Sequence, residues 1–181
     1  LKDSASRETS ARLLGDIGVS VTVSVIELLN DEASTDGALR TLEHLPPPPP
    51  KPILDFARVA VSRSREYDAL RRGVSSKSSD EALSLLEESL HEKSHQYGIR
   101  ALRAIGLLGD RDAMNLAIEN LQYRDIGQRA NVIEALESIS AKYRDVIQPL
   151  MKLWEDESAG AGEPNWERLL NDPDEWIRDC A

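Results

Sequence analysis

The chain has 181 residues, 40% of them apolar and 4% aromatic, and its formal net charge is −10. A surface that binds duplex nucleic acid needs clustered lysine and arginine to displace counterions, so this charge argues against a nucleic-acid partner. A chain of this length can bury one continuous core, and a core so poor in aromatic residues is typical of packed helices.

Cys180 is the only cysteine, so no internal disulfide can form and we expect a reducing, cytoplasmic location. No stretch reaches the ~18 apolar residues of a membrane-spanning helix, because polar residues interrupt the apolar run at 19–29. We therefore expect no direct membrane insertion by this segment. The chain shows no signal peptide, begins with Leu1 rather than Met and ends inside a predicted helix, so we expect an excerpt of a longer protein.

Amphipathic helices are predicted over most of the chain, which makes an all-α fold of about nine or ten helices. Residues 19–29 alternate valine with serine or threonine as a strand would, but we assign them to a helix because the repeat described below requires it. Nine long helices are predicted, over residues 3–15, 19–29, 32–45, 53–73, 80–91, 94–108, 112–122, 126–140 and 143–155. A short helix at 166–170 and the beginning of another at Asp174 follow.

The run PPPPPKP at Pro46–Pro52 predicts a stiff polyproline II connector between two sub-blocks of one domain, residues 1–45 and 52–181. Pro52 suits the first turn of the next helix. Pro46, Pro49 and Lys51 also match the ligand pattern of adaptor domains with aromatic grooves. Five consecutive prolines match that pattern almost automatically, so we prefer the rigid spacer.

The predicted helix at 53–73 carries two patterns. Its apolar face comprises Phe56, Val59, Ala60, Tyr67, Leu70 and Val74. Arg63 falls inside this face and is expected to pair with a carboxylate, because an unpaired buried charge is costly. Arg58, Arg65 and Arg72, spaced seven apart, form a stripe elsewhere on the helix. They are the candidate binding residues for an anionic partner, although such a stripe is more often a solvated face.

His91-Glu92-Lys93-Ser94-His95 fits the H-E-x-x-H signature of zinc peptidases, which needs both histidines on one face of a continuous helix and a third ligand. A helix break predicted near Ser94 would separate the histidines, and nothing singles out Glu119 or Asp112 as a third ligand. We therefore expect an accidental match, with no catalytic residues, no metal and no cofactor.

The C-terminal end gathers Cys180 and the three tryptophans, Trp154, Trp166 and Trp176. We expect an inert buried thiol rather than a nucleophile, and tryptophans that pack between helices rather than form a binding platform.

An internal repeat is the strongest pattern in the chain. Residues 14–18 (LGDIG) match residues 105–109 (IGLLG) at an offset of 91, and the apolar face at 39–45 matches 133–139 at an offset of 94. An aspartate followed four residues later by an arginine begins three predicted helices: Asp3/Arg7, Asp125/Arg129 and Asp174/Arg178. On a helix, this spacing lets the two side chains meet.

The units LLNDPDEWIRDCA and RALRAIGLLGD resemble HEAT-type repeats, including the PBS-lyase-like variety, and the resemblance covers most of residues 1–45 and 94–181. It implies an α-α superhelix, a HEAT/armadillo-like solenoid. In HEAT repeats, aspartate and arginine side chains form a ladder between neighbouring units. By that resemblance Asp125, Arg129, Asp174 and Arg178 are structural.

A finer resemblance links residues 128–181 to the soluble helical segment of certain large bacterial membrane proteins. Those proteins join a transporter-like domain, of nucleotide-translocase or major-facilitator type, to HEAT repeats and often to a cyclic-nucleotide-binding domain.

Three functions follow as hypotheses. The first is a non-catalytic scaffold that binds a protein partner or neighbouring domains of the same chain, because stacked helix pairs present a curved docking surface. The second is a cytoplasmic regulatory segment of a transporter-like membrane protein. The third, and least favoured, is an enzyme, either a zinc hydrolase or a chromophore lyase as the repeat family's name suggests.

Overall fold

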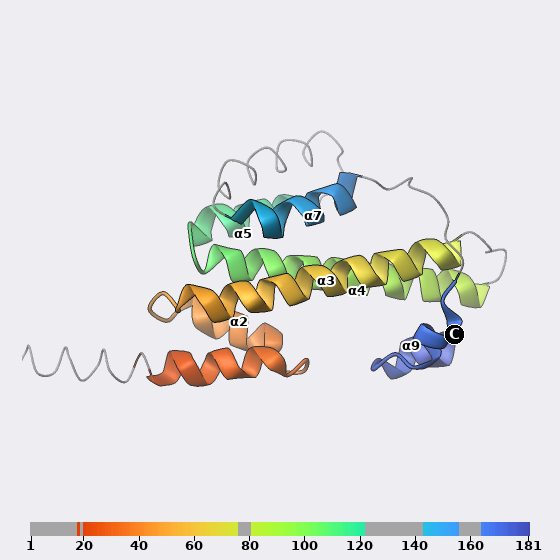
Figure 1. The fold of residues 1–181 in the computed structure, drawn as a ribbon, viewed down its shortest axis with the longest axis horizontal. Helices are drawn as coiled ribbons and strands as arrows, with labels where there is room; N and C mark the ends of the chain where they lie inside the picture. Colours follow the sequence, from red (N-terminus) through yellow and green to blue (C-terminus); the bar gives the residue numbers. More distant parts are fainter. Residues whose placement is uncertain (1–17, 19, 76–80, 122–142, 156–163) are drawn as a thin grey trace, which may run out of the picture.

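The computed structural model describes residues 18, 20–75, 81–121, 143–155 and 164–181, and these residues form helices joined by short turns (Figure 1). No strand occurs among them, so the all-α prediction is confirmed for this part of the chain. Residues 20–27 are helical and continue into η1. The elements in chain order are η1 (Leu28–Asn30), α2 (Thr35–Glu43), α3 (Pro50–Ser75), α4 (Glu81–Gly106), α5 (Arg111–Leu121), α7 (Arg144–Glu155), α8 (Trp166–Leu170) and α9 (Glu175–Cys180).

The antiparallel pair α3–α4 forms the centre of the fold, and each of the two helices has 26 residues (Figure 1). Helices α5 and α7 lie along one side of the pair, and α2 lies along the other. The short helices α8 and α9 lie against the N-terminal half of α4, away from α2 and α5. The pair therefore contacts every other layer of the described structure.

Small buried residues let α3 and α4 approach closely at their middle. Ser64 Oγ donates to the carbonyl of Ser94 at 2.7 Å, and Ser94 Oγ donates to the carbonyl of Ser64 at 2.8 Å. Both serines are buried, as is Gly98 one turn further along α4. The two reciprocal bonds fix the relative register of the helices, because a slip of one residue would leave both hydroxyls buried without a partner.

Two apolar clusters lie on either side of this contact. The larger one gathers residues of α2, α3, α4, α5 and α7 around Leu39, Leu42, Leu102 and Leu150. The second holds α8 and α9 against the far end of the α3–α4 pair, and it comprises Tyr67, Leu70, Val74, Leu86, Leu90, Leu169 and Ile177.

The predicted helix break near Ser94 is wrong, because α4 is continuous from Glu81 to Gly106. A serine before an apolar run is a common N-cap signal. Here the hydroxyl of Ser94 donates to α3 instead, so it stabilises a contact between two helices rather than the start of one.

The polyproline connector is shorter than predicted, since α3 begins at Pro50 and residues 50–52 lie in its first turn. Proline is tolerated there because the first amide groups of a helix have no intrahelical acceptor. Arg111 of α5 donates to the carbonyls of Glu43 and Leu45. Its positive charge is also stabilising there, because a helix C-terminus such as that of α2 carries a partial negative charge. With Lys51 in a helix and Pro48 buried, the adaptor-ligand pattern does not form a continuous polyproline helix.

The helix predicted at 19–29 is confirmed over residues 20–27, followed by the 3₁₀ turn η1. Thr22 is buried and donates to the carbonyl of Gly18 at 2.7 Å, whereas Val21 and Val23 are exposed, so the alternation does not separate a buried apolar face from an exposed polar one. Helix α2 begins at Thr35, three residues later than predicted, with Ala38, Leu39 and Leu42 buried as expected. The predicted helices at 3–15 and 126–140 lie outside the described residues.

We predict that Ser64→Ala lowers the free energy of unfolding by about 1 kcal/mol, because it removes one buried hydrogen bond between α3 and α4. Urea denaturation measures the change. Ser62→Ala, an exposed position on the same helix, is the control and is expected to stay within about 0.5 kcal/mol of wild type. Equal effects of the two substitutions would contradict a register-setting role for Ser64.

Two glycines should respond in opposite directions to alanine. A Cβ at Gly37 in α2 would meet nothing within 4 Å, so Gly37→Ala should raise the free energy of unfolding by about 0.5–1 kcal/mol through helix propensity.

A Cβ at Gly106 would lie 3.0 Å from Cβ and Cγ of Met114. Gly106→Ala should therefore lower the free energy of unfolding by about 1 kcal/mol, because the added methyl group forces α5 away from α4. Thermal melts of both variants test this, and a higher melting temperature for Gly106→Ala would disprove the tight α4–α5 contact.

Candidate functional site

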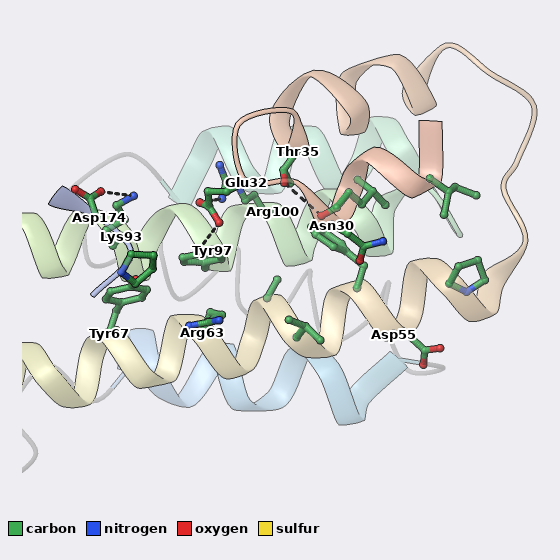
Figure 2. A pocket seen from close by; sticks show the side chains of 17 residues that line it. Asn30, Glu32, Thr35, Asp55, Arg63, Tyr67, Lys93, Tyr97, Arg100 and Asp174 are labelled. Atoms are coloured by element: carbon green, nitrogen blue, oxygen red, sulfur yellow. Dashed lines mark hydrogen bonds and ion pairs between the residues drawn. The ribbon is translucent and has the colours of Figure 1, made fainter. Parts of the chain in front are cut away.

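An open groove with a volume of about 750 Å³ runs along one side of α3 (Figure 2). Its N-terminal wall comes from residues 26–35, and its other end is closed by the connection between α8 and α9. The α3 side chains that line it are Pro52, Asp55, Phe56, Val59, Ala60, Arg63 and Tyr67, and the α4 side chains are Lys93, Tyr97 and Arg100.

The α3 lining follows helical periodicity, with steps of three or four residues along one face. From Pro52 to Tyr67 this face is about 22 Å long at ~1.5 Å per residue. The groove therefore has the length of about seven residues of extended chain at ~3.3 Å each.

A buried arginine anchors the N-terminal wall to α4. The Arg100 guanidinium makes a two-point contact with Asp36, at 3.0 Å from Nε and 2.9 Å from Nη2, and Nη1 lies 2.6 Å from Glu32. Arg100 also lies over the ring of Tyr97, 5.2 Å from its centroid, and the Tyr97 hydroxyl donates to Glu32 at 2.5 Å. One cation is thereby shared by two carboxylates from another part of the chain.

These contacts shift the pKa values of the groups involved. The Arg100 hydrogen bond holds the pKa of Asp36 below its ordinary value. Burial opposes ionisation of Glu32, but hydrogen bonds from Tyr97 and Arg100 outweigh it and lower the Glu32 pKa as well. Burial also works against the charge on Arg100, yet the two carboxylates raise its pKa, so the cluster is held in its ionised form.

A stacked tyrosine pair connects this cluster to the C-terminal helices (Figure 2). The rings of Tyr67 and Tyr97 lie 5.7 Å apart and are tilted by only 9°. The Tyr67 hydroxyl lies 3.1 and 3.2 Å from the carboxylate oxygens of Asp172, and burial followed by this carboxylate raises the Tyr67 pKa to about 12. Arg168 joins the same cluster, 2.8 Å from Asp172 and 2.6 Å from Glu66.

An ion pair closes the far end of the groove. Lys93 Nζ of α4 lies 2.7 Å from Asp174, which also accepts from the amide of Trp176 as the N-cap of α9. The hydrogen bond from Lys93 is the main cause of the lowered Asp174 pKa. In the described part of the chain, every buried side-chain nitrogen or oxygen atom has a hydrogen-bond partner. The buried polar atoms of the groove are therefore satisfied without a ligand, whereas the side chains of Glu32 and Asp55 are more than half exposed.

The other half of the groove is apolar. Ile26, Leu29 and Phe56 line it, and Val59 on α3 is 60% exposed although it belongs to the predicted apolar face of that helix. Val59 therefore belongs to the apolar face of α3 but lines an open groove instead of the core.

The arginine stripe Arg58, Arg65 and Arg72 does not line this groove. Arg58 lies 3.0 Å from Asp145 of α7, Arg72 lies 2.6 Å from Asp68 on its own helix, and Arg65 is exposed. Arg65 and Arg72 border a shallow depression between α3 and α7 that Asp68 and Asp145 also line. Carboxylates thus lie close to the stripe.

Arg63 pairs with Glu66 at 3.6 Å, which confirms the expected carboxylate partner, but its side chain is half-exposed at the groove rather than buried.

Asp174 and Arg178 do not meet as their spacing suggested. Asp174 pairs with Lys93, and Arg178 donates to the carbonyls of Asp172 and Pro173 at 2.7 and 3.1 Å. Asp174 is the N-cap of α9, and Arg178 holds the turn that precedes this helix. Asp125 and Arg129 lie outside the described residues.

The two histidines of the H-E-x-x-H match lie on one side of the continuous α4, with ring centroids 6.4 Å apart. The expected separation of these histidines by a helix break is therefore wrong. Within the described ranges, no three His, Cys, Asp or Glu side chains are grouped so that they could hold a metal ion.

At the C-terminal end, Cys180 is half-buried beside the second apolar cluster, into which Trp166 also packs. Trp176 is 56% exposed, and its indole nitrogen donates to Ser89 of α4 at 2.9 Å. The side chain of Trp154 lies outside the described part.

Sequence reasoning did not single out Glu32, Tyr97 or Arg100, which line the groove, or Asp36, which binds Arg100. One signal was available, since Arg100 lies within the apolar run Ile99–Ile105 and a charge there needs a partner. The identity of that partner, more than 60 residues away, has no counterpart in local spacing.

Comparisons of the chain with protein-family models, with curated proteins and with solved structures found no match. Across the described residues, no helix combines the length and the apolar character needed to cross a membrane.

We predict that Arg100→Met removes part of the acid sensitivity of folding. The pKa values of Glu32 and Asp36 are lower in the folded protein than their ordinary values of 4.5 and 3.8. Their contribution to stability is therefore present above those values and is lost as the pH falls through the folded-state values. Without Arg100 both carboxyls should titrate closer to their ordinary values, so stability should fall less steeply from about pH 5 to about pH 3.

Urea denaturation at a series of pH values measures this difference. Asp174, whose pKa is also lowered, is unchanged in both proteins, so the comparison isolates the Arg100 cluster. Parallel pH profiles for wild type and Arg100→Met would show that the guanidinium does not hold the two carboxylates in their charged form.

Proposed function

We propose that this chain is a non-catalytic helical-repeat scaffold of the HEAT type, and that the groove along α3 docks a segment of another protein or of a neighbouring domain. The observation that carries the proposal is the combination of an apolar half, in which Val59 is exposed, with a polar half whose buried atoms already have hydrogen-bond partners. Such a groove keeps its shape without a ligand and offers apolar area to cover.

The layered arrangement supports the repeat part of the proposal. Helices α5 and α7 lie on one side of the α3–α4 pair and α2 lies on the other, as stacked helical units do (Figure 1). In such stacks each unit contacts its neighbours, and the exposed surface along the stack serves as a docking site.

The charges in the groove support binding rather than catalysis. A general acid or base works best with a pKa near neutrality. Here the pKa values of Glu32, Asp36 and Asp174 are lowered and that of Tyr67 is raised, so each shift leads away from neutrality. These groups are suited to fixed ion pairs and hydrogen bonds.

Site-specific photocrosslinking tests the proposal. A photoreactive amino acid is placed at Val59 in the groove or at Leu116 on α5, two positions that are each 60% exposed. The variants are expressed in the cells that normally make the protein, and crosslinked peptides are identified by mass spectrometry. We expect one defined peptide segment to crosslink from position 59 and not from position 116.

The matched exposure of the two positions makes the comparison specific, because both are equally open to random collision. Identical sets of crosslinks from positions 59 and 116 would argue against a docking groove, as would the absence of any crosslink from position 59.

A further inference from the structure

The apolar half of the groove lies next to carboxylates on both of its sides. On the N-terminal wall, Glu27 and Asp31 are exposed neighbours of the lining residues Ile26 and Asn30. On the opposite wall, Asp55 lies one position before Phe56 on α3. Its side chain is 57% exposed, and its Oδ1 lies 3.5 Å from Nη1 of Arg58, which is itself 54% exposed. Such a surface ion pair is weak and leaves the carboxylate open to solvent. An apolar centre with a charged edge is the usual anatomy of a protein-binding surface.

The cationic side chains that line the groove are less exposed than Glu32 and Asp55. Arg100 is only 5% exposed and is shared by Glu32 and Asp36, so that cluster keeps a net charge of −1. The Glu32 side chain lines the groove and is 55% exposed, although its Oε1 accepts from Arg100 and its Oε2 from Tyr97. Lys93 is engaged by Asp174, and Arg63, the most exposed of these three cations, pairs with Glu66.

The sequence of the N-terminal wall has the same bias. Residues 20–39 contain Glu27, Asp31, Glu32 and Asp36 and no lysine or arginine. An acidic segment that entered the groove would therefore meet like charges along this wall, whereas a basic segment would meet opposite ones.

We infer that the groove selects a basic, amphipathic peptide segment, with apolar side chains over Phe56 and Val59 and lysine or arginine side chains against Asp55 and Glu32. This inference rests on the proposed docking function and adds the chemistry of the partner. The groove length of about 22 Å admits about seven extended residues. Because the carboxylates are half-exposed, they contribute more to partner choice and association rate than to raw affinity.

Two fluorescein-labelled peptides of about seven residues test the inference, one alternating leucine with lysine and the other leucine with glutamate. Fluorescence anisotropy with the purified chain gives both dissociation constants. We expect the lysine peptide to bind at least about tenfold more tightly, and its affinity to fall as salt is added. Val59→Ser should weaken this binding by about threefold or more, while Leu116→Ser should leave it unchanged.

A matched pair of charge reversals separates the groove from the overall negative charge of the protein. Asp55→Lys lies in the groove and Glu88→Lys lies on the exposed surface of α4, and both change the net charge equally. We expect the dissociation constant of the lysine peptide to be about five times higher for Asp55→Lys than for Glu88→Lys. Asp55→Asn, which preserves side-chain shape, should give a smaller loss in the same direction.

Equal effects of the two reversals, equal affinity for the two peptides, or no binding of the lysine peptide would each overturn the inference. None of these outcomes bears on the crosslinking result. A partner segment that crosslinks at position 59 but is acidic would likewise overturn the charge preference and leave the docking function standing.

Discussion

The close contact of α3 and α4 at Ser64 and Ser94 determines how the other parts of the structure meet. The two reciprocal hydrogen bonds hold the helices at the distance that small side chains allow. Tyr67 and Tyr97 each lie three residues after one of these serines, in helices that run in opposite directions. Long helical side chains lean back toward the N-terminus of their own helix, so both rings lean toward the serine contact and stack on each other.

The stacked tyrosines make one polar network out of two clusters. Tyr97 donates to Glu32 on the N-terminal side, and Tyr67 donates to Asp172 on the C-terminal side. Burying Arg100 is costly, and its carboxylate partners offset that cost only while the wall keeps its place beside α4. We therefore regard this network chiefly as a device that specifies where the wall packs. A groove with walls fixed in this way loses little conformational entropy when a ligand enters it.

Apolar spacing predicted most helices of the described part, because periodicity is a local property, whereas residues 19–29 were assigned to a helix only through the repeat. It failed where a polar residue has a tertiary partner. Ser94 has the local features of an N-cap, yet its hydroxyl bonds to another helix, and Asp174 has the spacing to meet Arg178 but pairs with Lys93. The groove itself draws on residues near positions 30, 60, 97 and 173. No local pattern brings these together, so the site could be recognised only from the tertiary structure.

Val59 lies on the apolar face of α3, yet its side chain is exposed, and this difference identifies the groove. Its place on the apolar face of α3 predicts burial, and its side chain is 60% exposed. Leu116 is equally exposed, and single exposed apolar residues are common on protein surfaces. Val59 differs because it lines a groove together with Phe56, and the buried polar atoms of the described residues all have hydrogen-bond partners. A ligand that covers this apolar area gains hydrophobic stabilisation, and the half-exposed carboxylates alongside favour a ligand that is also basic.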